Sequence, residues 1–270
     1  SLRIFSAPDS APATLPDSLQ LPLAVQVGQL RLGQLIYGES SGLGSLSPGE
    51  SIDTAFYSDG LTHRLERLQA RLGLLTLAGD ASLAGQRPFA VRAQAEVNGA
   101  AGEQPIALKL VGSGTLEQLQ VDGQAVAGVP GGTNTGAATG ELHVRLTPFA
   151  EQPLASLRLK LNGIDPALLV AGVPPALLDL EAQLDSTPAT PGTAASGHVH
   201  VSNRKSGALD RQLLPIESLQ SQLNWHGDSL VFDGLRLTLN GGGRLKGQGR
   251  LSGAQLDLDL TAQGIDAHAL

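Results

Sequence analysis

Apolar residues recur at every second position along much of this chain, and this alternation limits the folds open to it. The segment Leu256-Asp257-Leu258-Asp259-Leu260 is the clearest case. On an α-helix these side chains would be spread around the surface, whereas on a β-strand they separate onto opposite faces. The pattern therefore predicts strands with one apolar face and one polar face. The same alternation occurs at 21–27, 106–110, 157–161 and 235–239.

Turn-forming residues lie between these stretches. The chain contains 34 Gly and 16 Pro, which fits a turn-rich β-protein. Asn-Gly and Asp-Gly dipeptides tolerate the positive φ of tight hairpin turns, so they predict antiparallel hairpins. Six such dipeptides are present, and they begin at Asp59, Asn98, Asp122, Asn162, Asp233 and Asn240.

Helical signals are scarce. Asp165 can cap a short helix, Pro166 suits its first position, and Gly172 followed by Pro174 would end it. This pattern predicts about two helical turns over 167–171. We therefore predict an all-β, antiparallel-rich fold with at most one or two short helices.

The chain is predicted to contain two regions. Residues 1–20, with three prolines among Ala and Ser, are expected to form an extended lead-in. Residues 21–270 are expected to form the β-structure. The tripeptide Gly-Ile-Asp occurs at 163–165 and again at 264–266, each time after alternating leucines. This recurrence of the tripeptide predicts two sub-repeats that meet near residues 170–195.

Composition argues against several classes of protein. A formal net charge of −7 and a pI near 5.3 argue against a nucleic-acid binder. The absence of Cys excludes disulfide scaffolds, thiolate metal sites and cysteine nucleophiles. No stretch reaches the roughly 18 apolar residues of a transmembrane helix, and no signal-peptide pattern opens the chain. Because Met is also absent, we expect the chain to be a piece of a longer protein.

Catalytic and metal-binding patterns are weak. His198 and His200 would share one strand face and could in principle hold a metal, but no third ligand is near in sequence, so solvated histidines are favoured. No Ser lies in a Gly-x-Ser-x-Gly elbow. The glycine-rich run 241–249 lacks the ending of a phosphate loop and favours hairpin turns. Asp257 and Asp259 are expected on a solvated face. We predict no enzyme activity, no metal and no cofactor.

The apolar faces must be buried against a second sheet, a helix or something that is not protein. No amphipathic helix of useful length is present. The aromatic residues are one Trp, two Tyr and five Phe, so the faces are almost wholly aliphatic. An aliphatic surface suits acyl chains, which need apolar contact and little directional specificity. A closed aliphatic sandwich core would satisfy the same pattern, and both alternatives stay open on composition.

Several segments resemble the TamB branch of the AsmA-like proteins. The chain has Leu-Gln-Leu-Pro-Leu at 19–23 after a proline-rich lead, Pro88-Phe89 after Gly-Asp-Ala-Ser-Leu at 79–83, and Thr-Pro-Phe-Ala at 147–150. A further similar stretch runs from Gly197 through Asn203 to Trp-His-Gly at 225–227. The endings at 161–166 and 264–266 are similar to the recurring strand-terminating phrase of that family. The resemblance covers most of the chain from about residue 15.

The resemblance implies a periplasmic protein of a Gram-negative envelope, anchored in the inner membrane by an N-terminal helix. We expect this chain to be an internal fragment of such a protein, without the membrane anchor and the C-terminal signature domain. The resemblance also implies an elongated, curved β-sheet that forms an open hydrophobic groove and carries phospholipid between the two membranes. TamB proteins also pair with TamA, an outer-membrane barrel protein, in autotransporter and outer-membrane protein assembly. Contact with a TamA-like partner is expected through parts of the parent outside this chain.

Three functions therefore remain open. The first is a lipid conduit, the second is a scaffold for outer-membrane protein assembly whose edge strands accept client strands, and the third is an adhesin-like or carbohydrate-binding sandwich. The scarcity of aromatic residues weighs against the third. Alternation predicts that the following residues line the lipid groove: Leu23, Val25, Val27, Leu108, Leu110, Leu157, Leu159, Leu161, Leu235, Leu237, Leu239, Leu256, Leu258 and Leu260.

Overall fold

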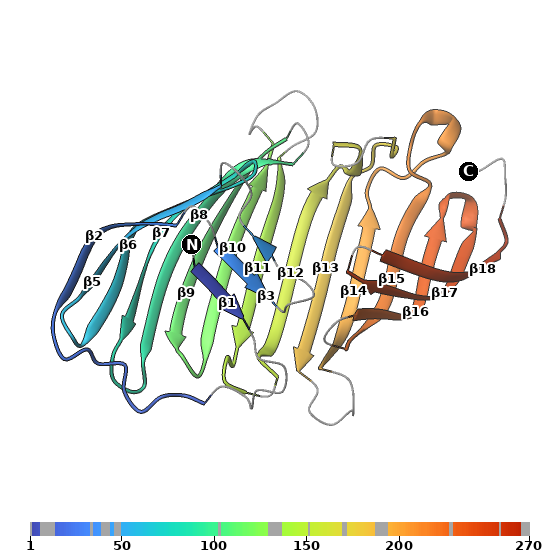
Figure 1. The fold of residues 1–270 in the computed structure, drawn as a ribbon. Coiled ribbons are helices and arrows are strands. Elements are labelled where there is room, and N and C mark those ends of the chain that lie inside the picture. Colours follow the sequence, from blue (N-terminus) through green and yellow to red (C-terminus); the bar gives the residue numbers. More distant parts are fainter. Residues whose placement is uncertain are drawn as a thin grey trace. The chain divides into compact units, whose positions relative to one another are not determined.

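The structure is a computed structural model that describes residues 2–5, 14–32, 35–38, 44–45, 50–101, 104–128, 137–150, 152–168, 172–186, 194–226, 229–253 and 255–265 (Figure 1). The fold is all-β, as predicted, and fifteen antiparallel strands form one open sheet. The helical residues in the described ranges belong to short 3₁₀ turns, at Pro166–Leu168, Leu209–Arg211 and Asn240–Gly242.

Strands that follow one another in the chain are also neighbours in the sheet, except that β2 pairs with β5. The order therefore runs from β18 down to β5 and ends with β2 (Figure 1). The strands are β2 (Val25–Leu32), β5 (Ser51–Ser58), β6 (Thr62–Leu72), β7 (Leu75–Ala84), β8 (Ala90–Ala101), β9 (Gln104–Thr115), β10 (Leu119–Ala127), β11 (Ala138–Leu146), β12 (Leu154–Ile164), β13 (Leu178–Ser186), β14 (Ala195–Asn203), β15 (Ile216–Trp225), β16 (Ser229–Leu239), β17 (Arg244–Ser252) and β18 (Gln255–Gln263).

A second, three-stranded sheet contains β1 (Leu2–Phe5), β3 (Leu35–Gly38) and β4 (Gly44–Ser45). Within it β1 and β3 pair in parallel. Strand β1 lies inside the segment predicted as an extended lead-in, so part of that segment adopts regular structure.

The chain divides into two compact units. Unit 1 contains Ser1–Ala100, Ile106–Gly123 and Leu146–Pro153, and unit 2 contains Ala101–Pro105, Gln124–Arg145 and Leu154–Leu270. The sub-repeats that we predict near residues 170–195 remain a prediction. None of the helices described is long and apolar enough to cross a membrane.

The strand registers place apolar residues opposite apolar residues. Directly opposed residues in an antiparallel pair have their side chains on the same face of the sheet. In unit 2, Leu161 lies opposite Leu180, which in turn lies opposite Val201. In unit 1, Leu83 lies opposite Val91. Each unit therefore has an apolar face and a polar face, which is the separation that alternation predicts.

The glycine dipeptides do not all form turns, and for four of the six the hairpin prediction is wrong. Asp59-Gly60 and the pair at 240–241 do lie between paired antiparallel strands. The pairs at 162–163 and 233–234 lie at bulges inside β12 and β16, where the glycines have φ of 71° and 59°. A bulge uses the same positive φ as a turn, so the dipeptide alone does not distinguish them. The pairs at 98–99 and 122–123 lie within β8 and β10.

The predicted short helix is a single 3₁₀ turn over Pro166–Leu168 in the described residues, and 169–171 lie outside them. Asp165 caps it as predicted. Its Oδ1 accepts hydrogen bonds from the backbone N–H of Ala167 at 3.1 Å and of Ala176 at 3.2 Å. The carboxylate therefore also fixes the chain that enters β13.

Candidate functional site: the apolar faces of the sheet

The predicted lining residues lie on strands, with one exception. Leu23 precedes β2 and is 62% exposed. The others occupy β2, β9, β12, β16 and β18. For β9, an ion pair at 3.4 Å joins Lys109 to Glu96, which faces away from the apolar side of β8. Leu108 and Leu110 flank Lys109, so they lie on the apolar side.

In unit 2 the registers bring the predicted leucines of three strands onto one surface. Leu237 lies opposite Leu219 on one side and Leu245 on the other. Leu258 lies opposite Gly249 on the same face. We define the apolar face of unit 2 as Leu157, Leu159, Leu161, Leu178, Leu180, Leu184, Val199, Val201, Leu219, Leu223, Phe232, Leu235, Leu237, Leu239, Leu245, Leu251, Leu256, Leu258 and Leu260.

Several members of this face are absent from the sequence-based list, although the same signal marks them. Leu178, Leu180 and Leu184 alternate with polar residues in β13, and Val199 and Val201 alternate with histidines in β14. The corresponding apolar face of unit 1 consists of Val25, Val27, Phe56, Leu65, Leu68, Leu77, Leu83, Val91 and Val97, extended on β9 by Leu108 and Leu110.

Burial differs sharply across the apolar face of unit 2. Leu235, Leu237 and Leu239 are buried, and Ile216, Leu219, Phe232 and Leu245 pack against them. The leucines of the edge strand β18 are 38–54% exposed. Leucines of β12 and β13 are half-buried. Among the described residues, the buried apolar side chains are Ala55, Phe89, Ala176, Ala195, Leu223, Leu235, Leu237 and Leu239. Most described side chains of the apolar face are therefore half-buried or exposed.

Two glycines interrupt the apolar face on β17. Gly247 lies opposite Leu235 and Leu260, and Gly249 lies opposite Phe232 and Leu258. A Cβ on Gly249 would lie only 2.6 Å from Cδ2 of Leu258. The leucine of the edge strand therefore leans over the space that the glycine leaves empty.

The polar faces hold ion pairs between neighbouring strands. In unit 2, Lys160 lies 3.0 Å from Glu181, and Arg204 lies 2.7 Å from Asp179. The hydrogen bond to the Glu181 carboxylate raises the pKa of Lys160. These exposed pairs contribute little stability each.

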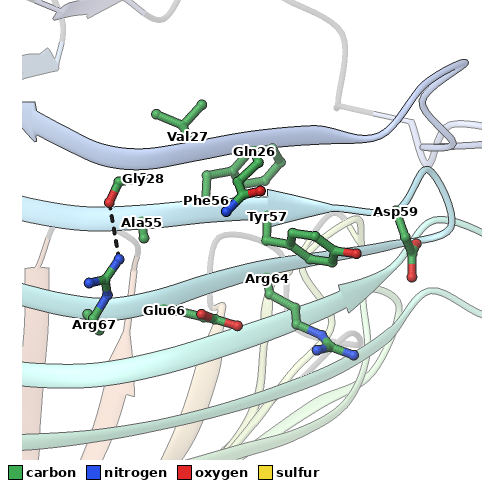
Figure 2. A pocket seen from close by; sticks show the side chains of 10 residues that line it. All are labelled: Gln26, Val27, Gly28, Ala55, Phe56, Tyr57, Asp59, Arg64, Glu66 and Arg67. Atoms are coloured by element: carbon green, nitrogen blue, oxygen red, sulfur yellow. Dashed lines mark hydrogen bonds between the residues drawn. The ribbon is translucent and has the colours of Figure 1, made fainter.

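A shallow hollow of about 350 Å³ lies beside β2, β5 and β6 in unit 1 (Figure 2). Arg67 Nη2 donates to the carbonyl oxygen of Gly28 at 3.1 Å, and the Arg64 guanidinium lies 6.0 Å from the centre of the Tyr57 ring. Asp59 lies at the end of the hollow (Figure 2). Its carboxylate accepts hydrogen bonds from the backbone N–H of Thr62 and Leu61, which lowers its pKa. The polar groups of Arg67 and Asp59 are therefore already bound to backbone groups of the same unit.

The histidine pair weighed as a metal site lies on the polar face. His198 is opposite Gln183 and Gln222, and His200 is opposite Glu181 and Gln220. In the ranges that the structure describes, no three His, Asp or Glu side chains are grouped so that they could hold a metal ion.

Comparison with known proteins assigns no family and no function to the chain. No family model, no curated protein and no solved structure matches the chain.

Proposed function

We propose that this chain is a segment of a periplasmic bridge-like lipid transfer protein, in which the apolar faces shield the acyl chains of phospholipid between the inner and outer membranes. The observation that carries the proposal is the apolar face of unit 2. It is aliphatic apart from Phe232, extends over seven consecutive strands, and leaves most of its side chains half-buried or exposed.

Acyl chains are the occupants that this chemistry favours. They need apolar contact without directional hydrogen bonds, and each methylene removed from water contributes about 0.8 kcal/mol. The strands of a sheet repeat every 4.8 Å or so, which gives a chain of methylenes a continuous path from one strand to the next. The binding free energy is spread over many leucines, and no single leucine has to bind the lipid strongly. The lipid can therefore bind tightly and still move along the face.

The cellular setting rests on the resemblance to the TamB branch of the AsmA-like proteins. The proposed setting is the periplasm. The inner-membrane anchor and the contact with a TamA-like outer-membrane partner would belong to other parts of the parent protein. The absence of Cys is compatible with that compartment.

The first test is native mass spectrometry, with solvent extraction, of protein purified without detergent from a bacterial host. We expect co-purified phospholipid in near-stoichiometric amount. Val199→Arg places a charge on the apolar face of unit 2 and should lower the bound lipid. His198→Arg is the matched control, because His198 is the preceding residue, lies on the polar face and is exposed.

The proposal fails if the folded protein carries no phospholipid, or if Val199→Arg and His198→Arg retain equal amounts. Circular dichroism of both variants separates loss of lipid from loss of fold.

A second function, scaffolding of outer-membrane protein assembly, is favoured by strand β18. All nine of its residues are exposed, and it forms one end of the strand order. Among the described strands only β17 pairs with β18, so the other backbone edge of β18 can accept a client strand by β-augmentation. Amide hydrogen exchange distinguishes this function. An unfolded outer-membrane protein should protect the amides of β18 if β18 is the docking edge, and should leave them unchanged if it is not.

A further inference from the structure

The polar face of unit 2 carries three cations close together. Arg236 on β16 lies directly opposite Lys246 on β17, and Arg244 lies opposite Thr238. Residues two apart on a strand share a face, so Arg244 and Lys246 project from the same side. We call Arg236, Arg244 and Lys246 the basic cluster.

The basic cluster is unfavourable for folding on its own. Like charges directly opposite each other in a ladder repel, and the residues directly opposite the cluster on the flanking strands carry no charge. On β15 the neighbours are Ser218 and Gln220, which lie opposite Thr238 and Arg236. On β18 the neighbours are Thr261 and Gln263, which lie opposite Lys246 and Arg244.

Two of the carboxylates near the basic cluster on this face have other partners. Asp233 accepts a hydrogen bond from Asn224 Nδ2 at 2.7 Å. Asp257 lies opposite Arg250 and accepts from Gln255. Asp259 lies opposite Gln248, whereas the residue opposite Lys246 is Thr261. Among the described residues, no ion pair joins a carboxylate to the basic cluster.

The three cations share one hollow. Its volume is about 370 Å³, and it is lined by the basic cluster, by Ser218, Gln220 and Thr238, and by two leucines. The described lining contains donors of four kinds, guanidinium, ammonium, hydroxyl and side-chain amide, and no carboxylate. The chain as a whole has a net charge of −7, so this concentration of positive charge is local.

We propose that the basic cluster is a binding site for a phosphate group. Two guanidinium groups can each donate two parallel hydrogen bonds to phosphate oxygens, and the Lys246 ammonium adds a point charge. A bound dianion would also remove the repulsion between Arg236 and Lys246. The site lies on the face opposite the one that we assign to acyl chains, so it does not depend on the proposed lipid function. The phosphate belongs either to a free anion or to a lipid headgroup.

The test measures binding of inorganic pyrophosphate by calorimetry, and flotation with phosphatidylcholine vesicles that contain or lack phosphatidylglycerol. Arg236→Gln and Lys246→Gln should each weaken binding roughly tenfold, as expected for the loss of a charge-assisted hydrogen bond. Arg250→Gln is the matched control, because Arg250 is on the same strand and face but lies opposite Asp257.

Pyrophosphate binding with this dependence supports the site with a free anion as ligand. Binding only to phosphatidylglycerol vesicles, with the same dependence, supports it with a headgroup as ligand. Absence of both, or an equal loss in Arg250→Gln, overturns it. Lys246→Gln relieves repulsion, so its thermal midpoint should equal or exceed that of the unmodified protein, which separates lost binding from lost folding.

Discussion

The side-chain amide of Asn203 donates a hydrogen bond to the backbone carbonyl oxygen of Ile216 at 2.9 Å. The same amide donates to the carbonyl of Leu214 at 3.3 Å, and its oxygen accepts from the backbone N–H of Leu177 and of Lys205 at 3.1 and 3.0 Å. Asn203 is only 9% exposed. One side chain therefore satisfies backbone groups at the ends of three consecutive strands, β13, β14 and β15.

Asn203→Asp should destabilise unit 2 by about 1–3 kcal/mol, because a carboxylate cannot donate to the carbonyls of Leu214 and Ile216. Urea unfolding followed by the fluorescence of Trp225 measures the change. Asn98→Asp is the control, since Asn98 is exposed within β8. An unchanged midpoint in Asn203→Asp would show that the two hydrogen bonds donated by the amide contribute no net stability.

Replacing His63 with Phe should release the chain that precedes β2. His63 Nε2 lies 2.8 Å from the carbonyl oxygen of Leu19, and it is the donor because a carbonyl oxygen can only accept. Nδ1 of the same ring lies 2.9 Å from the hydroxyl of the fully buried Ser58. The backbone N–H of Leu19 and Leu21 bind the carbonyls of Gly85 and Gly60. We expect these two amides to exchange faster with deuterium in His63→Phe. His198→Phe, at an exposed position, should leave their exchange unchanged.

Truncating two leucines of the apolar face of unit 2 should have unequal effects. Leu237 is 9% exposed between Leu219 and Leu245, so Leu237→Ala should cost about 2–4 kcal/mol of unfolding free energy. Leu258 is 51% exposed on an edge strand, so Leu258→Ala should cost less than about 1 kcal/mol. Chemical denaturation measures both. Equal costs would mean that a covering layer buries Leu258 in solution.

Gly247→Ala should loosen the pairing of β17 with β18. A Cβ at this position would overlap the backbone carbonyl oxygen of Asp259, which cannot move without breaking the ladder. We expect a loss of about 1–3 kcal/mol and faster amide exchange in β18. Gly28→Ala is the control, because nothing lies within 4 Å of a Cβ there. Comparable behaviour of the two variants would contradict the close approach of the strands.

Asp59→Asn should make stability less dependent on acid pH. The pKa of Asp59 is lowered in the folded protein from 3.8 by the backbone N–H groups of Thr62 and Leu61. A lowered carboxylate pKa contributes stability above the unfolded pKa, and this contribution is lost as pH falls through the folded pKa. The native protein should therefore exceed Asp59→Asn in stability at neutral pH, and the gap should close below about pH 4. A gap that widens in acid would contradict this assignment.

Much of the strand pattern could be predicted from the sequence because alternation is a local property. The leucines at 157–161 and 256–260 lie on strands and share one face with their neighbours, as the pattern predicts. Leu23 alternates equally well but lies outside any strand, because it precedes the point where pairing with β5 begins at Val25.

Turns are harder to predict, because a turn and a bulge both require a residue with positive φ. Asp59-Gly60 reverses the chain, whereas Asp233-Gly234 only bends β16. Both place glycine at positive φ. The difference is set by whether the strands on either side pair with each other or with other strands.

The strand class and the separation of apolar from polar side chains follow from the amino-acid sequence alone, because both depend on a two-residue period. Which apolar residues are buried depends on how the strands pair. Leu237 has strands on both sides, whereas Leu258 has a neighbour strand on one side only. The placement of Arg236 opposite Lys246 also depends on strand pairing, because it follows from the register between β16 and β17 across a bulge. Such registers are set by contacts between strands, and a local pattern does not contain them.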